Sequence, residues 1–264
     1  MSKSRTYQTE AIIIKKTKLG EADRILTLYT PHLGKIRGVA KGVRRCRSKM
    51  AGHLELLTHS QVWLARGRNL DTIIGSQTIS SFLPLKSDLW LTSCALYATE
   101  LVDQFTADQD ENYPLFQLLL ETMHHLCKAG NTDLVLRYFE IHLFNEVGYR
   151  PQLQQCVSCH LPQESVATSF CPSAGGVLCP RCNQNQPFTY PLSLDALKVL
   201  NVLQRGDYDT VSKLKINLEL SHELEEVIRH YLKYLLEREV KSALWLDSLR
   251  KQIEETTPRQ IALL

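Results

Sequence analysis

Thr9–Arg45 reads TEAIIIKKTKLGEADRILTLYTPHLGKIRGVAKGVRR and contains three short runs rich in β-branched residues. Turn-forming residues separate the runs at Leu19-Gly20 and between Pro31 and Gly34. Two more runs of this kind follow before residue 80. Because such runs are typical of β-strands, we expect five strands, at Tyr7–Lys16, Arg24–Thr30, Lys35–Val43, Glu55–Ala65 and Asp71–Ile79.

Five strands in so short a stretch are typical of a small closed barrel. The OB-fold is a five-stranded barrel whose surface binds oligonucleotides. An SH3-like barrel is the structural alternative, and the periodicity of the strands does not separate the two. We expect residues 1–80 to form an OB-fold nucleic-acid-binding domain.

The charge of the chain is unevenly distributed. Residues 1–80 hold fifteen Lys and Arg against five Asp and Glu, a net charge of +10, whereas the remainder of the 264 residues carries −7. Asymmetry of this kind indicates that the N-terminal part binds a polyanion.

The positive charge is densest in Gly34–Met50, GKIRGVAKGVRRCRSKM, which contains no acidic residue. A solvated loop usually mixes charges of both signs, whereas a block of one sign repels itself unless an anion neutralises it. We therefore favour a nucleic-acid-binding segment over a solvated loop. The candidate DNA-binding residues are Lys35, Arg37, Lys41, Arg44, Arg45, Arg47, Lys49, Arg66 and Arg68.

After Phe82 the apolar residues recur at helical spacing. We expect helices at Asp88–Phe105, Pro114–Ala129 and Asp133–Val147, and a long one from an N-cap at Ser221. The third is apolar on nearly all sides, so it should be the buried centre of one helical bundle. The fold class is therefore α+β and multidomain. We expect the α-helical domain at residues 81–149 and 192–264, interrupted by an insertion at 150–191.

The insertion has too few apolar residues to fold alone, but it holds five of the eight cysteines. Cys156 and Cys159 form one C-x2-C pair, Cys179 and Cys182 form another, and nineteen residues separate the pairs. This spacing predicts a four-thiolate zinc ribbon with one structural Zn²⁺. Cys171 and His160 are expected to be bystanders, and Gly175 and Gly176 to serve a sharp turn beside the ligands.

Sequence signatures of catalysis are missing. The chain has no P-loop, no G-x-S-x-G and no H-E-x-x-H, and no H-x-E precedes Cys179-Pro180-Arg181-Cys182 as it would in a zinc deaminase. We therefore do not expect an enzyme. No apolar run approaches the roughly 18 residues of a membrane span, and no export signal is evident, so we expect a cytoplasmic protein with reduced thiols.

Several stretches resemble the RecO family of bacterial recombination and repair proteins. These are GEADRILTLYT at Gly20–Thr30, GKIRGVAKGVRR at Gly34–Arg45, GHLE at Gly52–Glu55, CVSC and GGVLCPRC around the cysteine pairs, and RHYLKYLLEREVKSALWL at Arg229–Leu246. The resemblance covers most of the chain. Proteins similar to RecO pair an OB-fold with a helical domain that carries a zinc ribbon, and some members lack the four cysteines.

The resemblance implies a recombination mediator associated with the nucleoid. Such a protein binds single-stranded and double-stranded DNA and anneals complementary strands. With RecR, RecF and single-strand binding protein as partners, it helps to load RecA onto coated DNA. Displacing single-strand binding protein would need a groove for an acidic, apolar tail, with Lys128 and Arg137 as candidate anchors. A zinc-ribbon and OB-fold protein of translation or transcription that binds RNA is the alternative, and a zinc-dependent nuclease or deaminase a third reading.

Aromatic residues are scarce in the N-terminal part, which has only Tyr7, Tyr29 and Trp63 before residue 80. Base stacking on aromatic rings contributes about 1–3 kcal/mol per base, so a module with few rings should hold phosphates and leave the bases free to pair. Binding should then be sequence-independent and sensitive to salt. With roughly five to seven phosphates held, the log–log salt slope should be about −4.

Overall fold

The computed structural model describes residues 5–128, 130–163, 168–184 and 186–261. The chain divides into two compact units, Met1–Lys128 and Ala129–Leu264. The unit boundary therefore falls after the third helix of the chain, so the expected helical bundle is distributed over both units. The expected domain limits at residues 80, 149 and 191 stay a prediction. No helix within the described ranges is long and apolar enough to cross a membrane.

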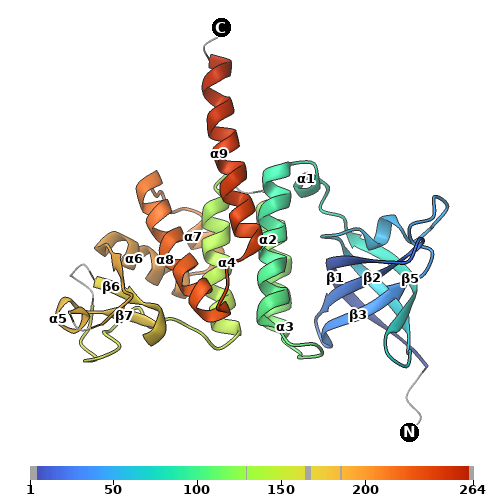
Figure 1. Ribbon diagram of the computed structural model, residues 1–264, viewed down its shortest axis with the longest axis horizontal. Helices are drawn as coiled ribbons and strands as arrows, with labels where there is room; N and C mark the ends of the chain where they lie inside the picture. The colour runs from blue at the N-terminus through green and yellow to red at the C-terminus, as the bar shows by residue number, and fades with distance from the viewer. Residues whose placement is uncertain (1–4, 129, 164–167, 185, 262–264) are drawn as a thin grey trace. The chain divides into compact units, whose positions relative to one another are not determined.

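Five strands form the barrel of the N-terminal unit: β1 (Thr6–Leu19), β2 (Asp23–Thr30), β3 (Gly34–Ala40), β4 (His59–Ala65) and β5 (Asp71–Ser80). They close in the order β1-β2-β3-β5-β4, with β1 antiparallel to β4 and β3 parallel to β5 (Figure 1). This order is that of a five-stranded Greek-key barrel. The expected OB-fold is confirmed, and the SH3-like alternative is set aside.

The barrel core consists of aliphatic side chains that alternate along the strands, among them Ala11, Ile13, Leu26 and Leu28. Alternation places every second residue on one face of a strand, which is why the sequence pattern located these strands well. The fourth strand begins later than expected. A 3-10 helix at Gly52–Leu54 comes directly before the expected start at Glu55, and the left-handed residue Leu57 (φ 59°) interrupts the extended backbone, so β4 begins at His59.

Helices α1 (Leu83–Lys86), α2 (Leu89–Phe105) and α3 (Tyr113–Leu126) complete the N-terminal unit. The side chains of Asp88 and Asn112 cap α2 and α3 by accepting a hydrogen bond from the backbone N–H three residues later. Both longer helices pack against the outside of the barrel, α2 on β1 and α3 on β2. One outer face of the barrel is therefore covered by helix.

The C-terminal unit contains α4 (Thr132–Glu146), α6 (Leu194–Arg205), α7 (Tyr208–Val211), α8 (Leu218–Leu236) and α9 (Lys241–Ile261). Helix α4 contacts α6, α7 and α8, so the expected central place of the third predicted helix is found within this unit. The expected N-cap at Ser221 is wrong. Asn217 caps α8 instead, and Ser221 is a buried residue one turn inside the helix.

The cysteine-rich insertion folds as a three-stranded sheet in the order β7-β6-β8, with β6 at Thr168–Cys171, β7 at Gly176–Leu178 and β8 at Tyr190–Leu192 (Figure 1). Short helices η2 (Pro172–Ala174) and α5 (Pro180–Asn183) flank β7. The sheet rests on helix α8 through an edge-to-face contact of Phe170 and Tyr231, whose ring centroids are 5.2 Å apart.

Candidate nucleic-acid interface and metal centre

Lys41–Lys49, here called the basic loop, leaves the end of β3 and folds over the turn between β1 and β2. Gly42 has φ 62°, a left-handed conformation that favours glycine, and its N–H donates to Asp23 Oδ1 at 2.7 Å. The N–H of Arg44 donates to the carbonyl of Ala22 at 3.0 Å, and Val43 is buried in the barrel core. These contacts fix the backbone of the loop on the barrel.

The cationic side chains of the basic loop all lie at the surface; they are Lys41, Arg44, Arg45, Arg47 and Lys49. Among the described residues, no carboxylate pairs with any of the five within 4.0 Å; the ion pairs of the N-terminal unit lie elsewhere. Arg44 Nη1 donates only to the carbonyl of Gly20, at 3.4 Å. The loop therefore presents five uncompensated positive charges to solvent.

Lys35 and Arg37 belong to the same acid-free stretch, Gly34–Met50, here called the basic run, but they have acidic neighbours in space. Lys35 is buried, and its Nζ donates to the backbone carbonyl of Asp103 at 2.6 Å and to Asp103 Oδ1 at 3.2 Å. Burial raises the pKa of Asp103, but hydrogen bonds from Lys15 and Lys35 outweigh this, so the pKa lies below its usual value. Arg37 is half-exposed and pairs with Asp108 at 3.1 Å. These two charges are neutralised within the protein.

Arg66 and Arg68 lie on the exposed loop between β4 and β5. The guanidinium carbon of Arg66 lies 4.8 Å from the centroid of the Tyr7 ring, a favourable cation–π distance. Arg66 and Arg37 line the same hollow at the start of β1 and β5. At about 3.3 Å per residue, the rise along β3 separates Arg37 from the start of the basic loop by about 13 Å.

The nine candidate residues therefore fall into two groups, the basic loop and a set around Arg37 and Arg66. Sequence reasoning omitted Lys18 and Arg24, which face each other across β1 and β2, beside the turn that the basic loop covers. Neither residue lies in the acid-free stretch Gly34–Met50, so only the pairing of β1 with β2 brings the two close to the loop. We add them to the candidates.

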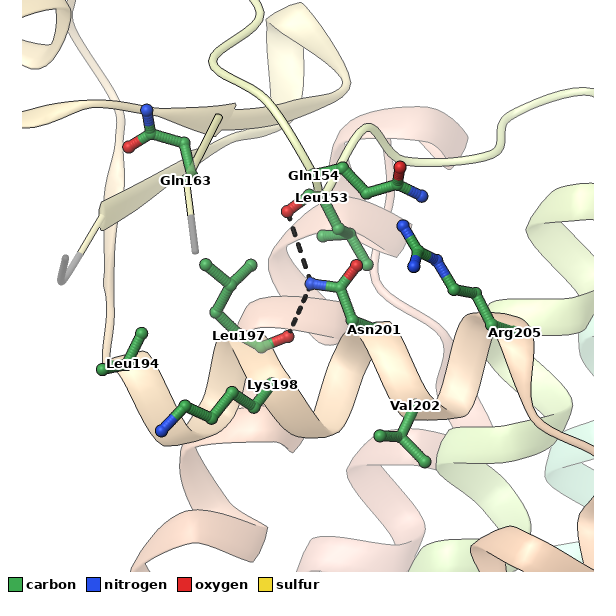
Figure 2. Close-up of a pocket in the computed structure, with 9 residues that line it drawn as sticks. All are labelled: Leu153, Gln154, Gln163, Leu194, Leu197, Lys198, Asn201, Val202 and Arg205. Carbon is green, nitrogen blue, oxygen red and sulfur yellow. Dashed lines mark hydrogen bonds between the residues drawn. The ribbon is translucent and has the colours of Figure 1, made fainter. Parts of the chain in front are cut away.

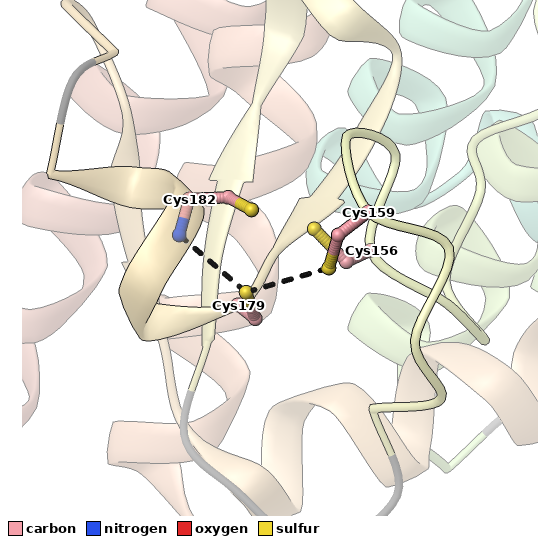
Figure 3. A group of neighbouring side chains, drawn as sticks. All are labelled: Cys156, Cys159, Cys179 and Cys182. Atoms are coloured by element: carbon pink, nitrogen blue, oxygen red, sulfur yellow. Dashed lines mark hydrogen bonds between the residues drawn. The ribbon is translucent and has the colours of Figure 1, made fainter.

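The four cysteines of the insertion gather at one point (Figure 3). Their sulfur atoms all lie within 4.8 Å of one another, and those of Cys159 and Cys179 are 3.8 Å apart. A tetrahedral zinc site with Zn–S bonds of about 2.3 Å requires sulfurs about 3.8 Å apart. The expected clustering is confirmed, and the donor set and its size fit a four-thiolate metal ion.

Backbone N–H groups of the insertion donate hydrogen bonds to the cysteine sulfur atoms. Cys179 caps α5, so the N–H of Cys182 points at the Cys179 sulfur at 3.4 Å. Burial acts to raise the pKa of the Cys156 thiol, but hydrogen bonds from the backbone of Cys159, Cys179 and Ser158 lower it to about 6. A thiol of low pKa is readily converted to the thiolate that binds metal.

The other expected ligand-site residues lie outside the cluster. Among the described residues, Cys171 and His160 are not part of it; Cys171 Sγ contacts Ser173 Oγ at 3.3 Å. Gly175 and Gly176 form the turn from η2 into β7 rather than a turn at the ligands. A Cβ on Gly176 would lie 2.5 Å from the carbonyl oxygen of Gln152, so the close approach of that segment requires glycine.

Known protein families match both the part of the chain that holds the basic loop and the part that holds the cysteine cluster. The family model of the Recombination protein O N terminal matches residues 1–82, and that of the Recombination protein O C terminal matches residues 86–244. The chain belongs to the RecO family. A DNA repair protein RecO from Dehalococcoides mccartyi strain CBDB1 is 47% identical over 250 residues, 95% of this chain and 98% of its own length. Another from Roseiflexus sp. strain RS-1 is 39% identical over 259 residues, 98% and 91% of the two chains.

This RecO family member also has a pocket of about 270 Å³ in its C-terminal unit, between α6 and the segment that leads to Cys156 (Figure 2). Aliphatic side chains line it, with Lys198 and Arg205 among the other lining residues. Asn201 Nδ2 donates to the carbonyls of Leu197 (2.9 Å) and Leu153 (3.4 Å), which joins the helix to that segment.

Arg137, an expected anchor for an acidic tail, is unsuited to that role. It is buried on α4, and its guanidinium pairs with the fully buried Glu140, with Nε 2.7 Å from Oε2. A buried cation with a buried partner is a structural group. That expectation is therefore wrong, because the side chain is not accessible to a tail.

Proposed function

We propose that this RecO family member is a recombination mediator of the nucleoid rather than an enzyme. It binds single-stranded and double-stranded DNA, anneals complementary strands, and helps RecR and RecF load RecA onto DNA coated by single-strand binding protein. The observation that carries the proposal is the basic loop, a set of unpaired cations fixed on an OB-fold barrel. Family membership favours this function over the RNA-binding alternative.

Annealing needs two backbones of like charge to approach. The five cations of the basic loop, Lys41, Arg44, Arg45, Arg47 and Lys49, reduce this repulsion by pairing with phosphates. Lys35 takes no part, because Asp103 already holds its ammonium group. Five phosphate contacts give a single-strand salt slope of about −3.5, slightly shallower than expected from the whole basic run.

The metal has a structural part in this proposal. Cys156, Cys159, Cys179 and Cys182 would hold one Zn²⁺ through four thiolates, which leaves no open position for water or substrate. When bound, the ion cross-links the two ends of an insertion whose own core is small. The chain's own residues then fix β6–β8 on helix α8.

The pocket beside α6 is the proposed docking place for the tail of single-strand binding protein. Leu153, Leu194, Leu197 and Val202 provide apolar contacts for the tail (Figure 2). Arg205 is exposed and can pair with an acidic side chain; Lys198 is also exposed, although Asp195 contacts it at 3.4 Å, so Arg205 is the stronger candidate. This pocket takes the place of the excluded Arg137 anchor.

The function is tested by strand annealing, with bare DNA and with DNA coated by single-strand binding protein. The double variant Arg44→Glu/Arg45→Glu reverses two exposed loop charges and is expected to abolish annealing of both substrates while the fold persists. Lys213→Glu/Lys215→Glu, which reverses two exposed charges of the C-terminal unit, is the control and should anneal normally. Equal activity of the two double variants would refute the proposal.

The metal assignment has a separate test. Cys179→Ser is expected to release one equivalent of zinc and to lower the unfolding temperature of the C-terminal unit. Metal binding is worth about 10–16 kcal/mol in zinc-finger peptides, so the loss should be large. Cys171→Ser, outside the cluster, should retain the metal. Elemental analysis measures the bound zinc of both variants, and thermal unfolding measures their stability. Retention of zinc by Cys179→Ser would exclude the assigned site.

A further inference from the structure

The N-terminal unit contains a groove that differs in character from the basic loop. It has a volume of about 540 Å³, within the range of about 300–1,000 Å³ typical of small-molecule sites. The first residues of β1, the turn between β2 and β3, Gln61 of β4 and Arg66 just after β4 form its sides, and α3 contributes Tyr113, Phe116 and Gln117. We call it the His32–Tyr113 groove.

Two rings at the edge of this groove are stacked and exposed. The rings of His32 and Tyr113 are parallel to within 5°, with centroids 5.4 Å apart, an offset stack. The His32 side chain is 69% exposed and Tyr113 is 45% exposed. Each is held by a neighbour, since Gln117 Nε2 donates to the Tyr113 hydroxyl at 2.7 Å and Glu111 lies 3.2 Å from His32 Nδ1. The pair is therefore an oriented aromatic surface open to solvent.

The charges that line the groove nearly cancel. Glu10 is engaged by His59, with 3.2 Å between Oε2 and Nε2, and Arg66 is a cation among the lining residues. Gln8 and Gln61, both lining residues, supply amide groups that can donate and accept hydrogen bonds. A nearly neutral groove with aromatic rings and amides suits an uncharged, flat, polar ligand better than a phosphate.

We propose that the His32–Tyr113 groove takes one unpaired nucleobase of a bound single strand. The base stacks on the exposed ring pair, and its edge reaches the amides of Gln8 and Gln61. Arg66 is exposed beside the groove, so the backbone next to the base can run past its guanidinium, while Arg37 in the neighbouring hollow stays paired with Asp108. This inference rests on the proposed DNA-binding function and adds a contact to the base.

The groove also changes the expectation that this unit holds phosphates alone. Counting the aromatics of residues 1–80 missed it, because one ring is a histidine and the other comes from α3, outside that range. A single occupied base anchors the strand and leaves the remaining bases free to pair. Bases inside a duplex are stacked on each other and cannot enter, so the groove favours single strands.

The test compares an oligothymidylate with an abasic strand of equal length, which keeps the phosphates and lacks the bases. The wild-type protein should bind the abasic strand about tenfold more weakly, the effect of about one stacked base. His32→Ala/Tyr113→Ala should bind both strands with the same, weaker affinity. Tyr113→Phe, which keeps the ring, should retain the preference, and Tyr234→Ala, which removes an exposed ring from the C-terminal unit, should not alter it.

Photocrosslinking gives a readout that needs no variant. A strand that carries 5-bromodeoxyuridine should crosslink to the peptide containing Tyr113 or to the one containing His32. Wild-type protein that binds both strands equally, with crosslinks elsewhere, overturns the inference and leaves the DNA-binding function intact. Protein that binds neither strand overturns both.

Discussion

The two halves of the basic run, the strand half Gly34–Ala40 and the loop half Lys41–Lys49, both lack acidic residues but have opposite surroundings. In the strand half, Lys35 and Arg37 each have an acidic partner, Asp103 on α2 and Asp108 in the segment after it. In the loop half, Lys41–Lys49, no cation has a carboxylate partner among the residues that the structure describes. One half of the run thus joins a helix to the barrel, and the other remains charged at the surface.

The difference shows that a block of like charge is not in itself a binding surface. The acids that neutralise the strand half lie far along the chain; 68 residues separate Lys35 from Asp103. Folding brings them together because β3 and α2 pack in one compact unit. The loop half keeps its charge because it folds back on the turn between β1 and β2, where the carboxylate of Asp23 accepts a hydrogen bond from the backbone N–H of Gly42 and not from a loop cation.

The largest expected effect is on the free energy of unfolding, which should fall when a cation of the strand half is removed and stay nearly constant when one of the loop half is removed. Lys35→Met removes the buried one of the two lysines that pair with Asp103, and Lys15 remains at 2.9 Å. Breaking a buried ion pair outright costs about 3 kcal/mol, so the loss with one partner left should be about 1–2 kcal/mol. Lys41→Met, the same change at an exposed position of the loop, should alter the free energy of unfolding by less than about 0.5 kcal/mol. Chemical denaturation measures both. Comparable stability of the two variants would mean that Lys35 is not a structural cation.

Salt titration of DNA binding gives the next largest effect. Arg44→Ala removes one phosphate contact, so the log–log salt slope for a single strand should become shallower by about 0.7. Arg37→Ala removes a cation that Asp108 already neutralises, so its slope should match that of the wild type. The opposite ranking would place the DNA on the strand half instead of the basic loop.

Local patterns in the sequence were sufficient to predict most of the fold. Alternating β-branched residues predicted the barrel strands, because the alternation is visible within each strand. The two C-x2-C pairs predicted the cysteine cluster, because a spacing of nineteen residues between such pairs is typical of a zinc ribbon. Helix α8 begins earlier than expected, at Leu218, because Asn217 rather than Ser221 is its N-cap. Helix α6 was overlooked despite an N-cap at Ser193 and apolar residues at helical spacing.

The candidate interface was harder to predict, because it depends on contacts between distant segments. Sequence composition identified the cations, but the acids that neutralise Lys35 and Arg37 lie in the following region of the chain, which is acidic overall and is brought to β3 only by folding. The pairing of Lys18 with Arg24 required the register of β1 and β2. The stacked pair of His32 and Tyr113 required the packing of α3 on the barrel.

The smallest expected effect converts one half of the run into the other. Asp108→Asn removes the charge that pairs with Arg37 and keeps the shape of the side chain; Asp108 is half-exposed, so the fold should tolerate the change. Freed Arg37 can then contact a phosphate, which should steepen the salt slope by less than the roughly 0.7 of one full contact, because Asp71 and Glu111 line the same hollow and repel the phosphate. Asp209→Asn, an equal change of net charge at an exposed site of the C-terminal unit, separates this local effect from a general gain in positive charge.

A steeper slope in Asp108→Asn alone would show that acidic neighbours, rather than the position of β3, keep the strand half from binding DNA. An equal response of the two variants would attribute the gain to net charge and leave Arg37 outside the interface.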